Sequence, residues 1–374
     1  MINKQRLVDE FIELVQIDSE TTKEEKIGAV LKEKFTSLGL EVVEDDAKEK
    51  TGHGAGNLIC TWHGNVPSAD PIYFTSHMDT VVPGEGIQPK IEDGIIRSDG
   101  TTILGADDKA GIAAMLESIR TIQENNLPHG TIQFVITVGE EAGLVGAKAL
   151  NASLLQAKYG FALDSDGEVG NIIVAAPYQA QFNIQVNGKT AHAGVAPEKG
   201  ISAITVAAKA IAKMPLGRID EETTANIGRF EGGTQTNIVC DKVHITAEAR
   251  SLSEEKLHTQ VNKMTTAFEE TAKEMGATAE VNSEIVYTGF KYTKEDTVVQ
   301  IAMKASERIG RKPKLLRSGG GSDANIIAGY GVPTVNLSVG YKDIHTTNEH
   351  IAIGDLVKLT EMVNAVVQEV VANT

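Results

Sequence analysis

The sequence predicts an α/β fold: a mixed, mostly parallel sheet with helices on both faces, and an α+β domain inserted into the chain. Two observations lead to this prediction. Short apolar runs that read as buried strands alternate with segments of helical periodicity, which is typical of strands joined by helices. The chain of 374 residues also exceeds one ordinary hydrophobic core, so two domains are expected.

Composition limits the classes of protein to which the chain can belong. A hydrophobic fraction of 41% and a charged fraction of 23% are typical of globular proteins. The net charge of −16 argues against a nucleic-acid partner, which would need a basic surface. No apolar run is long enough to cross a membrane or to form a signal peptide, so we expect a cytoplasmic protein with no membrane partner. Cys60 and Cys240 lie far apart without a partner motif, which favours free thiols in a reducing compartment.

Each element is predicted from the spacing of its apolar residues. Helices are predicted over 4–16, 22–38, 112–119, 143–150, 295–309 and 354–371. Strands are predicted over 40–43, 57–62, 71–75, 131–138, 159–163 and 334–337, with a small hairpin over 91–96. Between two of these strands the glycine-rich run 51–56 reads as a flexible turn, so nothing rigid is expected to hold its His53 as a metal ligand.

A histidine and an aspartate follow the buried strand 71–75. Side chains alternate along a strand, so His77 and Asp79 are expected to point the same way. The carboxyl ends of strands are where open α/β sheets bind ligands. We therefore interpret His77 as a metal ligand and Asp79 as the carboxylate that orients its ring. Taken alone, such a pair is more often a surface feature.

Further carboxylates follow other strands or precede a helix. Asp107 and Asp108 enter a helix whose small early residues should let its start pack closely on the sheet. Glu140 and Glu141 follow the strand 131–138, and Asp164 ends the strand 159–163. Each has a purely structural alternative: an aspartate can cap a helix, and glutamates favour the first turn of one.

Taken together, these side chains indicate a metal site. The ends of parallel strands meet at one edge of the sheet, where five carboxylates would repel one another unless cations compensate their charge. A second imidazole is expected, and His345 after the strand 334–337 is the best candidate. Imidazoles combined with carboxylates suit two divalent ions, with Zn²⁺ favoured and Co²⁺ or Mn²⁺ as alternatives.

The motif set resembles the M20 family of di-zinc metallopeptidases, and most of all its peptidase T (tripeptidase) branch. The resemblance covers nearly the whole chain in order, and it rests on 76–79, 105–111, 139–141, 163–164 and 344–345. It implies that one zinc is bound by His77 and Asp164, the other by Glu141 and His345, and both by Asp107. It further implies that Asp79 orients His77, that Glu140 is the general base, and that a cis peptide joins Asp107 to Asp108.

The segment 178–287 is predicted to be the inserted domain. Strands are predicted over 178–186, 243–250 and 278–286, with helices over 200–213 and 254–275, which gives an open sheet with helices on one face. The family resemblance implies that this segment is a lid that can also form a homodimer. It also implies that 1–177 and 288–374 together form a discontinuous catalytic, metal-binding domain.

Candidate substrate-binding residues lie in the lid and in a later glycine-rich loop. The resemblance makes His192 a candidate to stabilise the oxyanion, from its own subunit or from a partner. Asn237 and Arg250, on neighbouring strands, would together bind a substrate carboxylate, although Arg250 could instead form a surface salt bridge. Gly320 and Ser322 belong to a loop that would line the cleft; its spacing lacks the lysine of a phosphate-binding loop.

The predicted function is that of a metal-dependent exopeptidase that hydrolyses short peptides like a tripeptide aminopeptidase. A metal-bridged water would attack the peptide bond, with Glu140 as general base. The alternatives are an N-acyl-amino-acid deacylase or a carboxypeptidase of the same family, and a metal- or peptide-binding protein without catalysis. Glu140 argues against the last of these, because a binding protein needs no unligated base.

Overall fold

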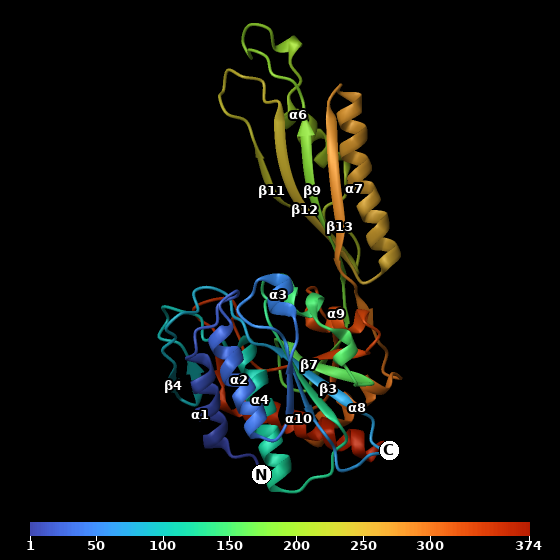
Figure 1. Ribbon diagram of the computed structural model, residues 1–374. Coiled ribbons are helices and arrows are strands. Elements are labelled where there is room, and N and C mark those ends of the chain that lie inside the picture. The colour runs from blue at the N-terminus through green and yellow to red at the C-terminus, as the bar shows by residue number, and fades with distance from the viewer. The chain divides into compact units, whose positions relative to one another are not determined.

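The structure is a computed structural model that describes residues 1–374, and it divides into two compact units (Figure 1). The first unit comprises Met1–Val174, Tyr292–Arg317 and Ser322–Thr374, and the second comprises Ala175–Lys291 and Ser318–Gly321. The second unit is thus one long inserted segment with an additional short one, and the division at 178–287 stays a prediction. Its role as a lid or dimerisation surface stays a prediction.

A mixed sheet forms the centre of the first unit. Its strands follow the order β1-β2-β6-β3-β7-β16-β8-β14, and β15 pairs with β8. The four consecutive strands at its middle are parallel: β6 (Ile132–Thr137), β3 (Ile72–His77), β7 (Tyr159–Ser165) and β16 (Thr334–Ser338). The outer strands are β1 (Glu41–Glu44), β2 (Leu58–Trp62), β8 (Asn171–Ala176) and β15 (Lys314–Arg317), together with β14 (Phe290–Lys291), whose residues end the long segment of the second unit. Four carboxyl ends therefore point to one edge.

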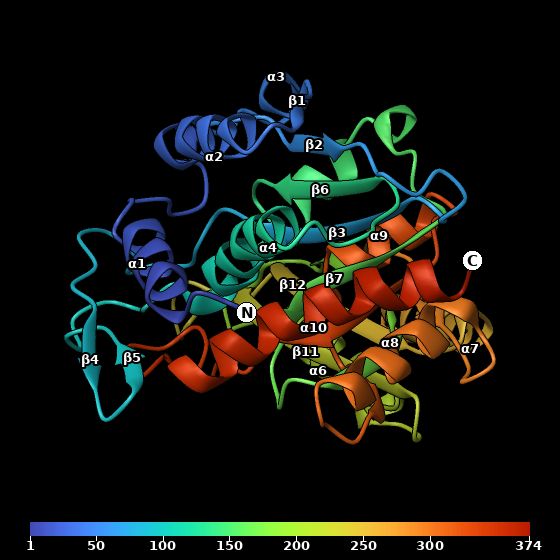
Figure 2. The ribbon, with the colours of Figure 1, turned by 90° about the horizontal axis from the view of Figure 1, so that it is seen from below.

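Helices cover both faces of this sheet, as predicted. One face carries α1 (Lys4–Val15), α2 (Glu25–Ser37), α4 (Ala106–Glu124), α8 (Thr297–Arg308) and α10 (Ile353–Ala372). Figure 2 shows α4 and α10 side by side next to β3 and β7. The other face carries α9 (Asp323–Gly329) and α5 (Val145–Ala149). The strand alternation explains both layers, because Phe74 packs in the first core and Tyr73 in the second.

Smaller elements complete the first unit. A three-stranded sheet joins β4 (Lys90–Glu92), β5 (Ile95–Arg97) and β17 (His350–Ala352), and α3 (Ala47–Thr51) contacts α5. Local caps explain several helix starts: the Asn3 side chain accepts from the Arg6 N–H, and Ser322 and Asn325 form a capping box at α9. No helix of the structure is long and apolar enough to cross a membrane.

The second unit has an antiparallel sheet and a hydrophobic core of its own. Its strands follow the order β10-β11-β12-β9-β13. They are β9 (Tyr178–Asn187), β10 (Gly217–Arg218), β11 (Thr223–Gly232), β12 (Lys242–Ser251) and β13 (Thr278–Tyr287). Two helices, α6 (Ala203–Lys213) and α7 (Glu254–Glu274), pack on the sheet through residues such as Ala207 and Phe268. This is the predicted open sheet with helices on one face.

Candidate metal centre

The strand ends of the first unit bring the predicted ligands together. His77 is the last residue of β3, and Asp164 lies near the end of β7. Glu140 and Glu141 follow β6, while Asp107 lies in the first turn of α4. His345 lies in the loop after β16. Because β3, β6, β7 and β16 are parallel, their carboxyl ends meet at one edge of the sheet.

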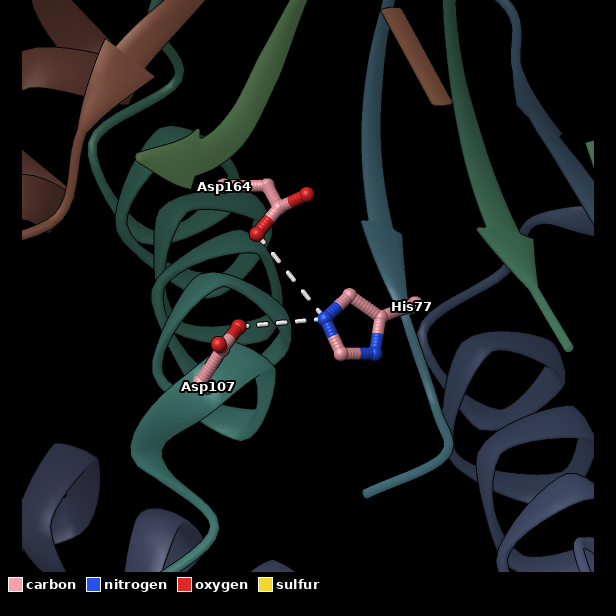
Figure 3. Close-up of side chains that lie close together, drawn as sticks. All are labelled: His77, Asp107 and Asp164. Atoms are coloured by element: carbon pink, nitrogen blue, oxygen red, sulfur yellow. Dashed lines mark hydrogen bonds and ion pairs between the residues drawn. The ribbon is translucent and has the colours of Figure 1, made fainter. Parts of the chain in front are cut away.

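One group of metal-binding side chains is formed by His77, Asp107 and Asp164, which point toward one another from β3, α4 and β7 (Figure 3). The His77 Nε2 atom lies 3.1 Å from Asp107 Oδ1 and 3.8 Å from Asp164 Oδ1. An imidazole facing two carboxylate oxygens is a donor set that suits a divalent cation.

A second group shares Asp107 with the first. The His345 Nε2 atom lies 3.3 Å from Asp107 Oδ2 and 2.9 Å from Glu141 Oε1. Asp107 therefore presents one oxygen to each imidazole, which is the arrangement expected of a carboxylate that binds two cations. Glu140 and Glu141 also form a group with His77, in which the three ligand atoms lie within 4.8 Å of one another.

Burial and neighbouring charges shift the pKa values of these groups. Burial raises the pKa of Glu140 well above its usual range, and nearby carboxylates reinforce the shift. Burial also raises the pKa of Asp164, with Glu140 and Asp107 adding to it. Hydrogen bonding to Asp107 and Glu141 raises the pKa of His345 to about 10. The carboxylates thus favour positive charge at this place, and the donor set fits two divalent cations.

The peptide bond between Asp107 and Asp108 is cis, as predicted. The two residues have φ, ψ values of −83°, 101° and −124°, 37°, outside the helical region, although they lie in the first turn of α4. This backbone directs the Asp107 carboxylate toward the imidazoles, while the Asp108 side chain is buried in the interior. The alternative in which one of these aspartates caps the helix holds for Asp108, because its Oδ1 accepts the Gly111 N–H at 3.3 Å, three residues on, after the non-helical residues.

Asp79 contacts more than the His77 ring that it was predicted to orient. Its Oδ1 lies 3.4 Å from His77 Nδ1, but the nearer partner of that nitrogen is the Asp79 main-chain carbonyl, at 3.0 Å. The carboxylate also accepts the N–H groups of Glu140 and Glu141 at 3.0 and 3.3 Å, and the Thr21 hydroxyl at 2.8 Å. One carboxylate therefore holds both His77 and the turn that carries the two glutamates.

His53 is held more firmly than its glycine-rich turn suggested. The side chain is buried, and its Nδ1 lies 2.8 Å from the buried Glu24 carboxylate, which also accepts the Gly54 N–H. The ring packs so closely on Gly139 that a Cβ there would lie 2.3 Å from His53 Cε1. The expectation of a loosely held ring was wrong, because its partners come from distant parts of the sequence. It supports the turn before Glu140 and belongs to none of the groups of metal-binding side chains.

Asp323 is a carboxylate close to the candidate metal centre that the sequence did not reveal. It opens α9 and is buried, and the Thr137 hydroxyl at the end of β6 donates a short hydrogen bond to its Oδ2. Burial raises the pKa of Asp323 to about 6. In the sequence, only the glycine-rich loop before Asp323 had a predicted role. No local pattern indicates a hydrogen bond between Asp323 and Thr137.

The structure does not bring Asn237 and Arg250 together as a pair that could bind one carboxylate. Asn237 lies beyond the end of the β11–β12 hairpin where Gly232 pairs with Val243, whereas Arg250 pairs with Thr224 near the other end. The predicted joint site is therefore wrong within one chain, because antiparallel pairing places the two residues at opposite ends of the sheet.

The other predicted substrate-binding residues have local structural partners. His192 lies next to the Asn237 loop, where Ala193 N–H donates to the Asn237 carbonyl at 2.9 Å. The Gly320 N–H donates to the Ser318 hydroxyl at 3.0 Å. Ser322 caps α9, and its hydroxyl accepts from Asn336 Nδ2 at 3.2 Å. Roles for these residues in substrate binding stay predictions.

Arg250 has all of its observed hydrogen bonds within the second unit. Its Nε and Nη2 atoms both donate to the Glu248 carboxylate at 3.0 Å, and Nη1 donates to the Gly319 carbonyl at 3.1 Å. This is the salt bridge named as the alternative to a substrate-binding role. The fork of the guanidinium faces Glu248, so a substrate carboxylate would have to take the place of Glu248.

An α/β sheet with two imidazoles and a cluster of carboxylates at its carboxyl edge defines a class of metal-dependent hydrolases. Comparison with known families identifies the family within this class. Residues 73–369 match the model of peptidase family M20/M25/M40, and the chain belongs to this family of hydrolases that act on peptide bonds. The resemblance found in the sequence is confirmed.

Individual relatives agree with this assignment. The chain is 66% identical to the uncharacterized protein YqjE of Bacillus subtilis over 99% of both chains. Its sequence is 67% identical to that of aminopeptidase PepT from Bacillus cereus, and the crystal structure of that protein matches with a TM-score of 0.96 over 99% of both chains. A tripeptidase from Staphylococcus aureus is 52% identical, with a TM-score of 0.97 over 100% of both chains.

Proposed function

We propose that the chain is a metal-dependent aminopeptidase that removes the first residue from short peptides, tripeptides among them. The observation that carries this proposal is the Asp107 carboxylate, which faces His77 with one oxygen and His345 with the other while Glu140 lies in the same cluster. The similarity to an aminopeptidase and to a tripeptidase supports the choice of substrate.

The ligands divide between two cations, most consistently Zn²⁺, with Co²⁺ or Mn²⁺ as alternatives. His77 and Asp164 would hold one cation, Glu141 and His345 would hold the other, and Asp107 would contact both. When bound, two such cations lower the pKa of a water molecule and polarise the carbonyl of the scissile bond. Asp79 would keep the His77 ring and the glutamate turn in place through the bonds described above.

Glu140 would act as the proton carrier. It would accept a proton from the attacking water and return it to the nitrogen of the leaving amine, so that the C–N bond breaks as an N–H bond forms. Two observations support this role. Its N–H is fixed by Asp79, and burial raises the pKa of its carboxyl group, which favours holding the proton between the two transfers.

Substitution of the two neighbouring glutamates separates catalysis from metal binding. We expect Glu140→Gln to keep both metals and to lose about 10²- to 10⁴-fold in kcat, because only the proton carrier is removed. Glu141→Gln serves as the matched variant and should lose bound metal, since it removes a ligand. The measurements are metal content after dialysis and tripeptide hydrolysis. A Glu140→Gln variant with near wild-type kcat would show that the assignment of the base is wrong.

One substrate mixture separates the proposed activity from its alternatives. It contains a free tripeptide, the same peptide with a C-terminal amide, its N-acetylated form, and an N-acetyl amino acid. Removal of the first residue from the free tripeptide alone would support a tripeptide aminopeptidase that recognises both the free amino group and the free carboxylate of its substrate. Cleavage that spares only the amide would favour recognition of the carboxylate, for which Arg250 would exchange Glu248 for the substrate. Cleavage of the N-acetyl amino acid alone would identify a deacylase.

A further inference from the structure

A buried glutamate outside both metal groups holds the segment that carries Asp107. Glu349 is 1% exposed. Its Oε2 accepts the N–H groups of Leu104 and Gly105, both at 2.8 Å, and its Oε1 accepts the Asp107 N–H at 2.9 Å. Three backbone hydrogen-bond donors at the entrance to α4 are thus satisfied by one side chain that is distant in the sequence.

This contact satisfies the N–H groups that precede the local cap of α4. The first N–H groups of a helix have no partner within the helix and are normally satisfied by a nearby side chain. Asp108 caps the regular part of α4 through the Gly111 N–H at 3.3 Å, but the turn before it has no side-chain cap: Gly105 has φ +76°, and Asp107 departs from helical geometry. The conformation of this segment therefore depends on Glu349 rather than on regular helical hydrogen bonds.

Glu349 also belongs to the loop that carries His345. The base of that loop is closed by two hydrogen bonds: Lys342 N–H donates to the His350 carbonyl at 2.9 Å, and His350 N–H donates to the Lys342 carbonyl at 3.1 Å. The Glu349 N–H donates to Thr346 within the loop at 3.2 Å. Strand β17, which begins at His350, then pairs with β5. The backbone of Glu349 is therefore fixed while its side chain reaches the Asp107 segment.

We propose that Glu349 is a positioning residue that sets the spacing between His345 and Asp107, and thereby shapes the half of the metal centre formed with Glu141. This inference rests on the proposed metal-dependent function. Both ligand-bearing segments meet at one carboxylate, and the His345 Nε2 atom lies 3.3 Å from Asp107 Oδ2. Glutamate suits the task because both of its oxygens accept hydrogen bonds, whereas glutamine would turn an NH₂ group toward a backbone N–H.

Titration of the metal-free, full-length chain with Co²⁺ tests the proposal directly. Visible absorption of bound Co²⁺ reports the geometry of its ligands, and competition with a chelator gives the affinities. We expect two equivalents to bind to the wild type. In Glu349→Gln one equivalent should bind about 10- to 100-fold more weakly, with an altered spectrum, and the other should be affected less.

Glu117→Gln is the matched control. Glu117 is another fully buried carboxylate in the first unit, within α4 itself; it accepts the Asn3 N–H at 2.9 Å and pairs with Arg6 at 2.7 Å. Its observed hydrogen bonds go to residues 3, 6 and 121, none of which lies in a loop that carries a candidate ligand. Its replacement should lower the melting temperature of the metal-free chain while leaving both Co²⁺ affinities and the spectrum unchanged.

A double substitution keeps the test valid if Glu349→Gln also loosens the fold. If Glu349 acts by placing His345, its substitution matters little once His345 is absent. Glu349→Gln should therefore weaken Co²⁺ binding much less in the His345→Ala background than in the wild type. Additive losses, unchanged affinity in Glu349→Gln, or an equal loss in Glu117→Gln would each overturn the proposal. A wild type that binds no Co²⁺ would instead remove the metal-dependent function on which the proposal rests.

Discussion

Several carboxylates around the candidate metal centre are not expected to bind metal themselves. They hold the backbone of segments that carry a candidate ligand or lie beside one. Asp79, Glu24 and Glu349 each accept backbone N–H groups from segments that carry a ligand or lie beside one. Such hydrogen bonds to a charged acceptor are stronger than neutral ones. The positions of the ligands therefore depend on a surrounding set of fixed anions, which adds to the repulsion that cations must compensate.

Asp323 makes the stability of the metal-free chain depend on pH. The raised pKa of about 6 means that the folded chain holds a proton which the unfolded chain releases near the ordinary aspartate value of about 4. Below that value both states are protonated. As the pH rises toward 6, ionisation favours the unfolded state and stability falls; above 6 the effect is complete.

We expect Asp323→Asn to lack this dependence. The free energy of unfolding of the wild type, relative to the variant, should fall by about 1 kcal/mol or more between about pH 5 and about pH 8. Urea unfolding in the presence of a chelator measures it, and asparagine can still accept the Thr137 hydroxyl. A difference that stays constant over this range would show that Asp323 ionises normally.

Most side chains of the candidate metal centre could be located from the sequence because they belong to local patterns. His77 and Asp164 lie at or near the end of a buried strand, and Glu140 and Glu141 follow one, so the rule that α/β sheets bind ligands at the carboxyl ends of their strands places these side chains at one edge. Glu349, Asp323 and the pair of Glu24 with His53 could not be found, because their partners are distant in the sequence and only tertiary packing brings them together. The opposite placement of Asn237 and Arg250 likewise follows from strand register.

At the scale of elements, helix α4 links the sheet to the metal centre, and Gly111 determines how closely it packs. A Cβ at this residue would lie 2.2 Å from Ser76 Oγ, 2.7 Å from Asp108 Oδ1 and 3.0 Å from the Leu163 carbonyl. Small residues at the start of this helix predicted close packing on the sheet, and the structure confirms it. The contact with β7 backbone leaves no room for an added methyl group.

A pair of glycine substitutions tests this contact. Gly111→Ala should lower the free energy of unfolding by about 1–3 kcal/mol, because overpacking must move α4 away from the sheet. Gly354→Ala in α10 is the matched control: nothing lies within 4 Å of a Cβ there, so alanine should be neutral or add up to about 1 kcal/mol. Denaturant unfolding measures both. Equal effects of the two changes would contradict tight packing at Gly111.

At the scale of the whole molecule, the sequence predicted two domains from chain length and from a change in pattern near residue 178. Each of the two units has a hydrophobic core of its own. The segment Ser318–Gly321 could not be assigned from sequence, because its place in the second unit depends on distant contacts. Its Gly319 carbonyl accepts a hydrogen bond from Arg250, and a Cβ at Gly321 would lie 2.4 Å from the Tyr287 ring.

All candidate metal ligands lie in one unit, so removal of metal should destabilise that unit more than the other. Every group of side chains that could hold a metal ion lies in the first unit. Cations that bind only the folded chain would stabilise that unit by about 4 kcal/mol at a concentration 1,000-fold above the Kd. Chelation should therefore speed amide hydrogen exchange in β3, β6 and β7 while leaving β9 and β12 of the second unit unchanged. Exchange that accelerates equally in both units would mean that their stabilities are not independent, and unchanged exchange in β3 would mean that no cation stabilises this sheet.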